Sequence, residues 1–123
     1  MAVDSPLVGW GTPSEEDDLL PLNIHSPAYQ NGLQVKTGPG YLFGFTAYSS
    51  NAGAQWIQVF DLIGPPASGA IPVVAFKVAT ITHLYQNWIP PRTFLVGIWI
   101  GNSTTGPTYT AGAADTFFDV QFV

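Results

Sequence analysis

Charged residues are scarce in this chain, and most of the acidic ones lie at its start. They make up 9% of the 123 residues, against about 25% in typical soluble domains. Residues 1–18 hold five acids and no Lys or Arg, whereas residues 19–123 hold three acids and three bases. A nearly neutral body behind an acidic segment is poorly suited to life as a free monomer, because soluble surfaces usually carry many charges. We therefore expect a subunit of a larger assembly.

Several other absences exclude whole classes of protein. Cysteine is absent, so disulfides and thiolate metal sites are excluded and the redox compartment stays open. The basic residues Lys36, Lys77 and Arg92 are too few to build a cationic surface for nucleic acid. The longest apolar runs, such as residues 94–100, fall well short of the roughly 20 residues of a membrane span. The first residues lack a basic region followed by an apolar one, so no secretory signal is expected.

Proline and glycine are abundant in residues 1–33, which predicts an extended, acidic N-terminal arm. Two interpretations of its acidic run stay open. Ser14 and Asp17 loosely match a capping box, which would start a short helical turn that Pro21 ends. Alternatively, residues 15–18 form only a solvated run of charges, because short isolated helices are marginal in water.

From residue 34 onward, short runs of β-branched and aromatic residues alternate with Gly, Pro, Asn and Ser clusters, which is the spacing of strands. No convincing helix appears, so we expect one all-β domain over residues 34–123, an antiparallel β-sandwich or a jelly-roll-like barrel. The predicted strands are residues 33–37, 41–48, 54–62, 71–80, 84–89, 93–101 and 116–123.

Alternation of side chains supports these strands and raises a question about their outer faces. Phe118 and Val120 fall on one face of the last strand, and Asp119 falls on the other. Residues 73–78 and 94–100 are apolar on both faces. A second apolar face predicts cover by another subunit or by the arm. The alternative is that these strands lie in the middle of a small core.

No catalytic constellation stands out, and we expect neither an enzyme nor a cofactor, a metal site or a small-molecule substrate. No serine lies in a nucleophile elbow, and His25 and His83 have no acid at a suggestive spacing. We expect His83 to be a strand-edge side chain with a backbone partner. Asp61 and Asp115 stand at strand ends, where an Asp usually accepts backbone hydrogen bonds, and Asp119 should face outward.

Aromatic residues make up 14% of the chain and favour one alternative function. A neutral β-sandwich with exposed aromatic rings is also typical of carbohydrate-binding modules. Trp56 and Trp99 lie in the middle of strand patterns and more naturally pack in a core or at a subunit contact. Trp88, beside two prolines, and Tyr109, in a long loop, are the candidates for contact with a ligand.

Two stretches of the body resemble small virion structural proteins of tailed bacteriophages. The first is GFTAYSSN at residues 44–51 running into AQWIQVFD at 54–61. The second comprises RTF at 92–94, GIWIGNS at 97–103, GAAD at 112–115 and FDVQ at 118–121. The resemblance spans residues 41–123 and does not extend to the acidic arm.

The resemblance implies a component of the virion, made in the host cytoplasm, and a capsid decoration (cement) protein fits best. Such proteins are compact β-domains, often homotrimers, that bind the major capsid protein and bridge its subunits. The acidic arm would suit a basic patch on the shell. A head-fibre or tail module and a carbohydrate-binding sandwich remain alternatives. The candidate partner contacts are Trp10, Glu15, Glu16, Asp17, Asp18, Leu19, Leu20, Trp88, Trp99 and Tyr109.

Overall fold

The computed structural model describes residues 20–123, and these residues form strands and loops. Residues 1–19 of the expected arm over residues 1–33 lie outside this range. The all-β class is confirmed for the described part of the chain. Its strands are Leu22–His25 (β2), Gly32–Lys36 (β3), Gly40–Ser49 (β4), Gln55–Phe60 (β5), Val74–Val78 (β6), Thr82–Phe94 (β7), Ile98–Ser103 (β8) and Thr116–Phe122 (β9).

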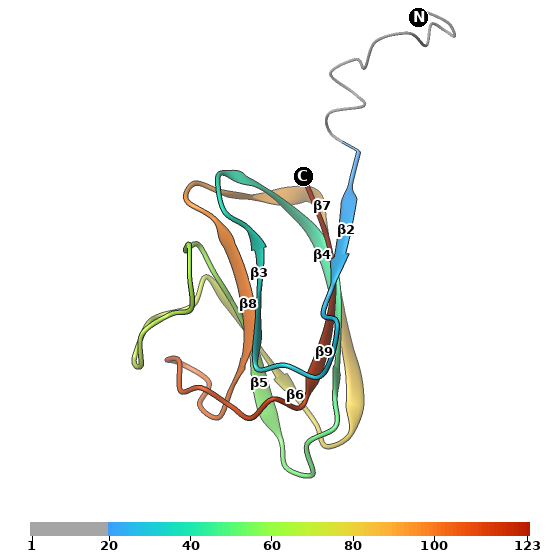
Figure 1. Cartoon of the computed structure of the whole chain (residues 1–123), viewed down its shortest axis with the longest axis vertical. Coiled ribbons are helices and arrows are strands. Elements are labelled where there is room, and N and C mark those ends of the chain that lie inside the picture. Colours follow the sequence, from blue (N-terminus) through green and yellow to red (C-terminus); the bar gives the residue numbers. More distant parts are fainter. Residues whose placement is uncertain (1–19) are drawn as a thin grey trace, which may run out of the picture.

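The strands form two four-stranded sheets that pack face to face (Figure 1). The first sheet has the order β2-β9-β4-β7 and the second has the order β3-β8-β5-β6. Neighbouring strands are antiparallel in both sheets. Apart from the β5–β6 hairpin, each connection carries the chain from one sheet to the other. This is the strand order of an eight-stranded jelly roll, so the expected antiparallel sandwich is confirmed in its jelly-roll form.

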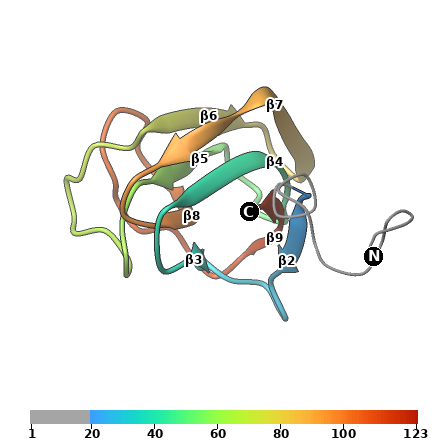
Figure 2. The same ribbon diagram turned by 90° about the horizontal axis from the view of Figure 1, so that it is seen from above.

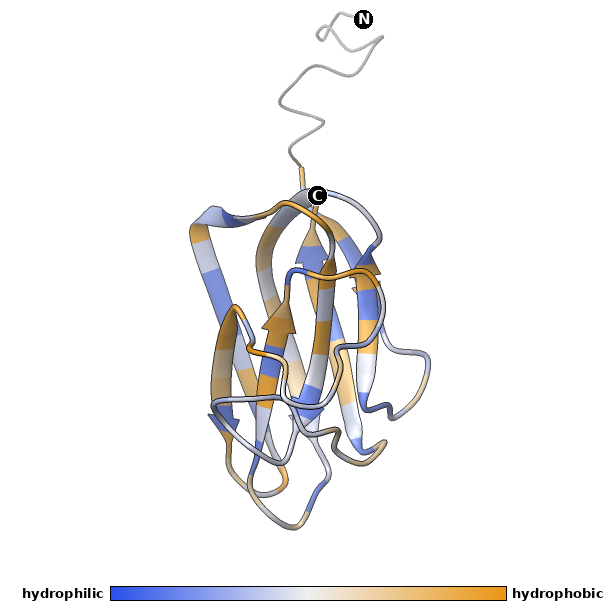
Figure 3. Cartoon of the chain, turned by 90° about the vertical axis from the view of Figure 1, so that its left-hand side faces the viewer, coloured by the Kyte–Doolittle hydropathy of each residue, from blue (hydrophilic) through white to orange (hydrophobic). Residues whose placement is uncertain are grey.

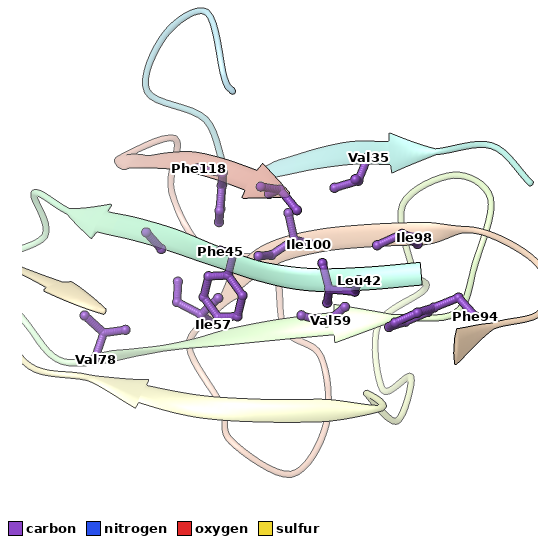
Figure 4. Close-up of a cluster of buried hydrophobic side chains, with 12 residues drawn as sticks. Val35, Leu42, Phe45, Ile57, Val59, Val78, Phe94, Ile98, Ile100 and Phe118 are labelled. Atoms are coloured by element: carbon purple, nitrogen blue, oxygen red, sulfur yellow. The ribbon is translucent and has the colours of Figure 1, made fainter. Parts of the chain in front are cut away.

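The main core lies between the two sheets and is built from alternate residues of the strands (Figure 4). Phe118 and Val120 are buried while Phe117 and Asp119 are exposed, as the alternation in the last strand predicts. Figure 3 shows the same banding of hydrophobic and hydrophilic residues along the strands. Each large apolar side chain that is fully buried stabilises the fold by about 1.5–3 kcal/mol. The buried members are Val35, Leu42, Phe45, Ala47, Ile57, Val59, Val78, Phe94, Ile98, Ile100, Phe118 and Val120.

Part of the segment expected to be an arm is an edge strand. β2 pairs with β9, with Leu22 opposite Phe122 and His25 opposite Asp119. The sequence pattern missed this strand because it has four residues and lies between two prolines. An edge position tolerates such a short, proline-bounded strand, since no other strand of residues 20–123 bonds to the second side of β2. The first sheet therefore begins at Leu22.

The boundaries of two other strands also differ from prediction. β7 continues through Pro90 and Pro91, which the sequence analysis took to separate two strands. β7 lies at the edge of its sheet, where the missing N–H groups of proline interrupt no central ladder. The predicted strand over residues 93–101 is wrong, because a turn at residues 95–97 separates β7 from β8.

Loops of the chain itself cover the outer, apolar face of β8. Figure 2 shows the β5–β6 and β8–β9 loops on the side of the second sheet that faces away from β4. Their backbones pair where Tyr109 N–H donates to Ala70 O and Gly69 N–H donates to Tyr109 O, each at 2.8 Å. Trp99 is 5% exposed beneath them. The second apolar face was expected to be covered by a partner subunit or by the arm. For Trp99 this expectation is wrong, because loops of the same chain cover the ring.

Candidate functional site

The expected partner contacts fall into three groups. Trp10, Glu15, Glu16, Asp17, Asp18 and Leu19 lie outside the described residues. Leu20 opens the described chain with 60% of its surface exposed. Trp88 is half-buried and packs against Phe45 and Phe76 of the core, with ring centroids 6.1 and 6.2 Å away. Trp99 and Tyr109 are each 5% exposed.

Trp99 and Tyr109 belong to a second aromatic cluster that is closed within the chain. Phe60, Trp99 and Tyr109 meet edge to face, with centroids 5.6–5.9 Å apart. Burial raises the pKa of the Tyr109 hydroxyl above its usual range. Neither ring is available at the surface, so the expectation that they contact a partner or a ligand is corrected.

Exposed apolar side chains gather instead at one end of the sandwich, in a group that we call the apolar rim. The rim consists of Leu62 and Ile63 after β5 and Leu95 and Val96 after β7. These residues are 36%, 58%, 74% and 47% exposed, respectively. The two segments adjoin, because a Cβ on Gly97 would lie 2.7 Å from Leu62 O and 3.1 Å from Ile63 Cγ1. Grouped apolar exposure of this kind is typical of a protein contact surface.

The carboxylate of Asp61 holds the two segments of the rim together. Its Oδ1 accepts the N–H groups of Val96 at 2.8 Å and Gly97 at 3.1 Å, and its Oδ2 accepts that of Leu95 at 3.1 Å. Desolvation raises the pKa of Asp61, but the three backbone donors outweigh it and leave the pKa below its ordinary value. The predicted role of Asp61 as an acceptor of backbone hydrogen bonds is confirmed.

Gln34 braces the rim from the neighbouring strand. Its Nε2 donates to the carbonyls of Lys36, Ile98 and Leu62 at 2.8, 2.9 and 3.1 Å. Its Oε1 accepts the N–H of Gly64 at 2.6 Å. With these bonds, the backbone beneath the rim is fixed from β3, β5 and β8, so the rim side chains are presented on a rigid support.

The rim lies at the end of the sandwich where the acidic segment joins the described chain. A hollow of about 200 Å³ beside Leu95 is lined also by Tyr41 and the last residue, Val123. Tyr41 and Val123 exchange two backbone hydrogen bonds of 2.9 Å. Leu22 pairs with Phe122 at the same end, where Figure 1 shows the C-terminus beside the start of β2. The described chain therefore begins at the end of the sandwich that carries the rim.

Asp115 has a structural role, but through side chains more than through the backbone. Its carboxylate accepts Asn51 Nδ2 at 2.6 Å, Asn102 Nδ2 at 2.8 Å, Thr116 Oγ1 at 3.0 Å and Gln55 Nε2 at 3.2 Å. This network fastens the start of β9 to the opposite sheet. Among residues 20–123, no group of three or more His, Asp or Glu side chains is placed to hold a metal ion. The same residues include no helix long and apolar enough to cross a membrane.

A larger hollow, of about 410 Å³, lies on the outer face of the first sheet. It brings together His25, His83 and Asp119, which are far apart in the sequence. Asp119 faces outward, as predicted. His83 packs on Tyr48 with ring centroids 4.8 Å apart, and no side-chain hydrogen bond joins it to a backbone group of the described chain. The prediction that the His83 side chain has a backbone hydrogen-bond partner is therefore wrong for the described residues.

Sequence reasoning missed the rim and most of the residues around the larger hollow. Leu95 and Val96 were assigned to the interior of a strand, because the turn that exposes them depends on Asp61, far away in sequence. Tyr48 and Phe117 sit at outward positions of correctly predicted strands, so their exposure could have been found from alternation. Their meeting could not, because it requires the register of β4 and β9.

Comparison with known proteins adds no relative: no protein-family model, no curated protein and no solved structure matches this chain. The functional conclusion therefore depends on the residues of the chain itself.

Proposed function

We propose that this chain is a capsid decoration protein of a tailed phage, which binds the outer surface of the head and bridges neighbouring major capsid protein subunits. The observation that carries the proposal is the apolar rim, exposed on a backbone that Asp61 and Gln34 hold rigid. A rigid apolar surface loses little conformational entropy on binding, which favours a protein contact of modest size.

The placement of charge supports the proposal that the rim contacts the major capsid protein. Five acids lie in residues 1–18, and the chain carries a formal net charge of −5. Because the described chain begins at the same end of the sandwich as the rim, we expect a partner with basic side chains around an apolar patch to meet both at once. Opposite charges would mainly speed the encounter and fix the register, while rim burial would supply affinity.

A homotrimer is part of the proposal and follows the resemblance to decoration proteins. Three linked copies would hold the head by several weak contacts together, because each bound copy raises the effective concentration of the others. Such a protein needs no catalytic group and no cofactor. Its proposed location is the capsid surface of the virion.

Labelling of intact phage particles tests the proposal against its alternatives. Antibodies against this chain, detected with gold on particles of the parent phage, should mark the whole head surface. Label confined to one vertex or to the tail would identify a head-fibre or tail module instead. Particles without label would contradict a virion role, with an antibody against the major capsid protein as the positive control.

A further inference from the structure

We propose that the hollow on the outer face of the first sheet binds a neutral saccharide, with one pyranose ring lying against Tyr48 and Phe117. This inference does not depend on the role of the rim. The hollow involves the end of β4 near Tyr48, whereas the rim lies near Tyr41 at the other end of the same strand. Its volume of about 410 Å³ falls within the about 300–1,000 Å³ typical of small-molecule sites.

The hollow is built from two adjacent rows of outward-facing residues on paired strands. In one row, Tyr48 of β4 lies between Phe117 of β9 and His83 of β7. In the next row, Asp119 lies between His25 of β2 and Thr46 of β4. Side chains directly opposite on antiparallel strands are neighbours, so an aromatic row lies beside a polar one.

The aromatic row offers flat apolar surface at fixed positions. Tyr48 is held against His83 with ring centroids 4.8 Å apart, and Phe117 against Tyr29 with centroids 4.3 Å apart. Phe117 nevertheless remains 38% exposed. A pyranose has one face made largely of C–H groups, and such a face packs on an aromatic ring without losing hydrogen bonds.

The polar row offers hydrogen-bonding groups that the described chain leaves largely unused. Within residues 20–123, the one side-chain hydrogen bond of Asp119 is long, at 3.4 Å from Gln121 Nε2 to Asp119 Oδ1. His25 Nδ1 donates to Ser26 O at 3.1 Å, which leaves Nε2 as its other polar atom. No side-chain hydrogen bond within residues 20–123 involves Thr46 or His83. Ring hydroxyl groups, which both donate and accept, match a carboxylate, two imidazoles and a hydroxyl gathered around one hollow.

The charges around the hollow exclude phosphorylated and other strongly anionic ligands. Of the described residues that line it, the only carboxylic acid is Asp119 and the only bases are His25 and His83. Lys36 and Lys77 belong to the second sheet, and Arg92 pairs with Leu42 toward the far end of β7. Without a Lys or Arg at the hollow, a phosphate or sulfate group would find no strong counter-charge. A neutral sugar ring, by contrast, can form hydrogen bonds through its hydroxyl groups with the polar side chains that line the hollow.

Titration of the ¹⁵N-labelled protein tests the inference directly. The probes are methyl β-D-glucoside, methyl β-D-galactoside, methyl α-D-mannoside and N-acetylglucosamine, each added to about 20 mM, since an open site of this size should bind a single sugar with Kd on the order of 1 mM. At least one probe should give saturable shifts clustered at Thr46, Tyr48, His83, Phe117 and Asp119.

Matched variants separate this site from a general surface effect. Tyr48→Leu removes a ring from the hollow, while Tyr41→Leu makes the same change at the other end of β4. Tyr48→Leu should weaken binding at least tenfold and Tyr41→Leu should leave it unchanged. Asp119→Asn, at an exposed position that does not threaten folding, should weaken it several-fold. Absence of saturable shifts with all four sugars would overturn the inference, as would binding that survives both Tyr48→Leu and Asp119→Asn. Shifts that depend on protein concentration and not on the sugar would also overturn it, because they would report self-association.

Discussion

The carboxylate of Asp61 accepts the backbone N–H of Val96 at 2.8 Å and thereby ties the end of β5 to the turn between β7 and β8. This bond joins the segment that follows β5 to the turn that leads into β8, and β5 and β8 are neighbours in the second sheet. It turns Val96 and its neighbour Leu95 outward, where an uninterrupted strand would have buried one of them. The surface that we assign to capsid binding therefore depends on the half-exposed carboxylate of Asp61.

Replacing Asp61 by Asn should destabilise the fold by about 1–2 kcal/mol at pH 7, because a charged acceptor of three N–H groups becomes a neutral one. The lowered pKa of Asp61 means that its ionised form stabilises the folded state. That contribution is present above its ordinary pKa, near 4, and is lost as the pH falls through the lowered value. Urea unfolding at pH 7 and pH 3 measures both effects.

For Asp61→Asn the difference from wild type should shrink at pH 3. An equal difference at both pH values would show that shape, and not charge, accounts for the effect of the substitution. Asp119→Asn is the control, because the Asp119 carboxylate is exposed and accepts no backbone N–H group from residues 20–123.

Alanine at Gly32 should destabilise the protein by about 1–3 kcal/mol through overpacking. Gly32 lies opposite Gly101, and the Trp99 ring rests on this glycine pair, so a Cβ on Gly32 would overlap the indole. Gly38 is the matched control, since a Cβ there has no heavy atom within 4 Å. Chemical unfolding followed by Trp fluorescence compares the two variants, and equal stability of both would refute the described packing of Trp99.

Removal of residues 1–19 should leave the body folded, because β2 begins at Leu22. Its unfolding midpoint should stay close to that of the full chain. Head binding should fall by roughly tenfold at low salt and by less at high salt, because the lost acids contribute a screened attraction. Sedimentation with phage heads at two salt concentrations measures the change.

Removal of residues 1–25 is the structural counterpart, because it takes away β2 and exposes the edge of β9. This longer deletion should destabilise the sandwich measurably. If the protein without residues 1–19 bound heads as well as the full chain, the acidic segment would have no role in head binding. The proposed role of the rim would not be affected by that result.

The sequence predicted most of the fold because the core strands alternate cleanly. β9 shows this best: Phe118 and Val120 point inward while Phe117 and Asp119 point outward, as a period of two requires. β2 was missed because four residues between prolines carry too short a pattern. The Pro90-Pro91 pair was taken as a break because nothing local shows that β7 is an edge strand.

The surface was harder to predict because it depends on contacts between distant residues. Trp99 was expected in a core or at a subunit contact, and the structure buries it within the chain: Gly32 and Gly101 make room for its ring and the loop bearing Tyr109 covers it. Leu95 was predicted to lie within a strand, but its N–H donates to the Asp61 carboxylate and it lies in a turn. Composition alone predicted an assembly subunit, and that prediction remains to be tested.

Quantitative binding to phage heads that lack this protein is the most direct test of capsid decoration through the rim. Leu95→Glu places a charge in the rim at a side chain already 74% exposed, and Ile89→Glu makes the same change at a residue of β7 that is 97% exposed. Both variants should fold like the wild type. The account predicts saturable binding of many copies per head for wild type and Ile89→Glu, and at least tenfold weaker binding for Leu95→Glu. Equal binding by the two variants, or no saturable binding by the wild type, would contradict it.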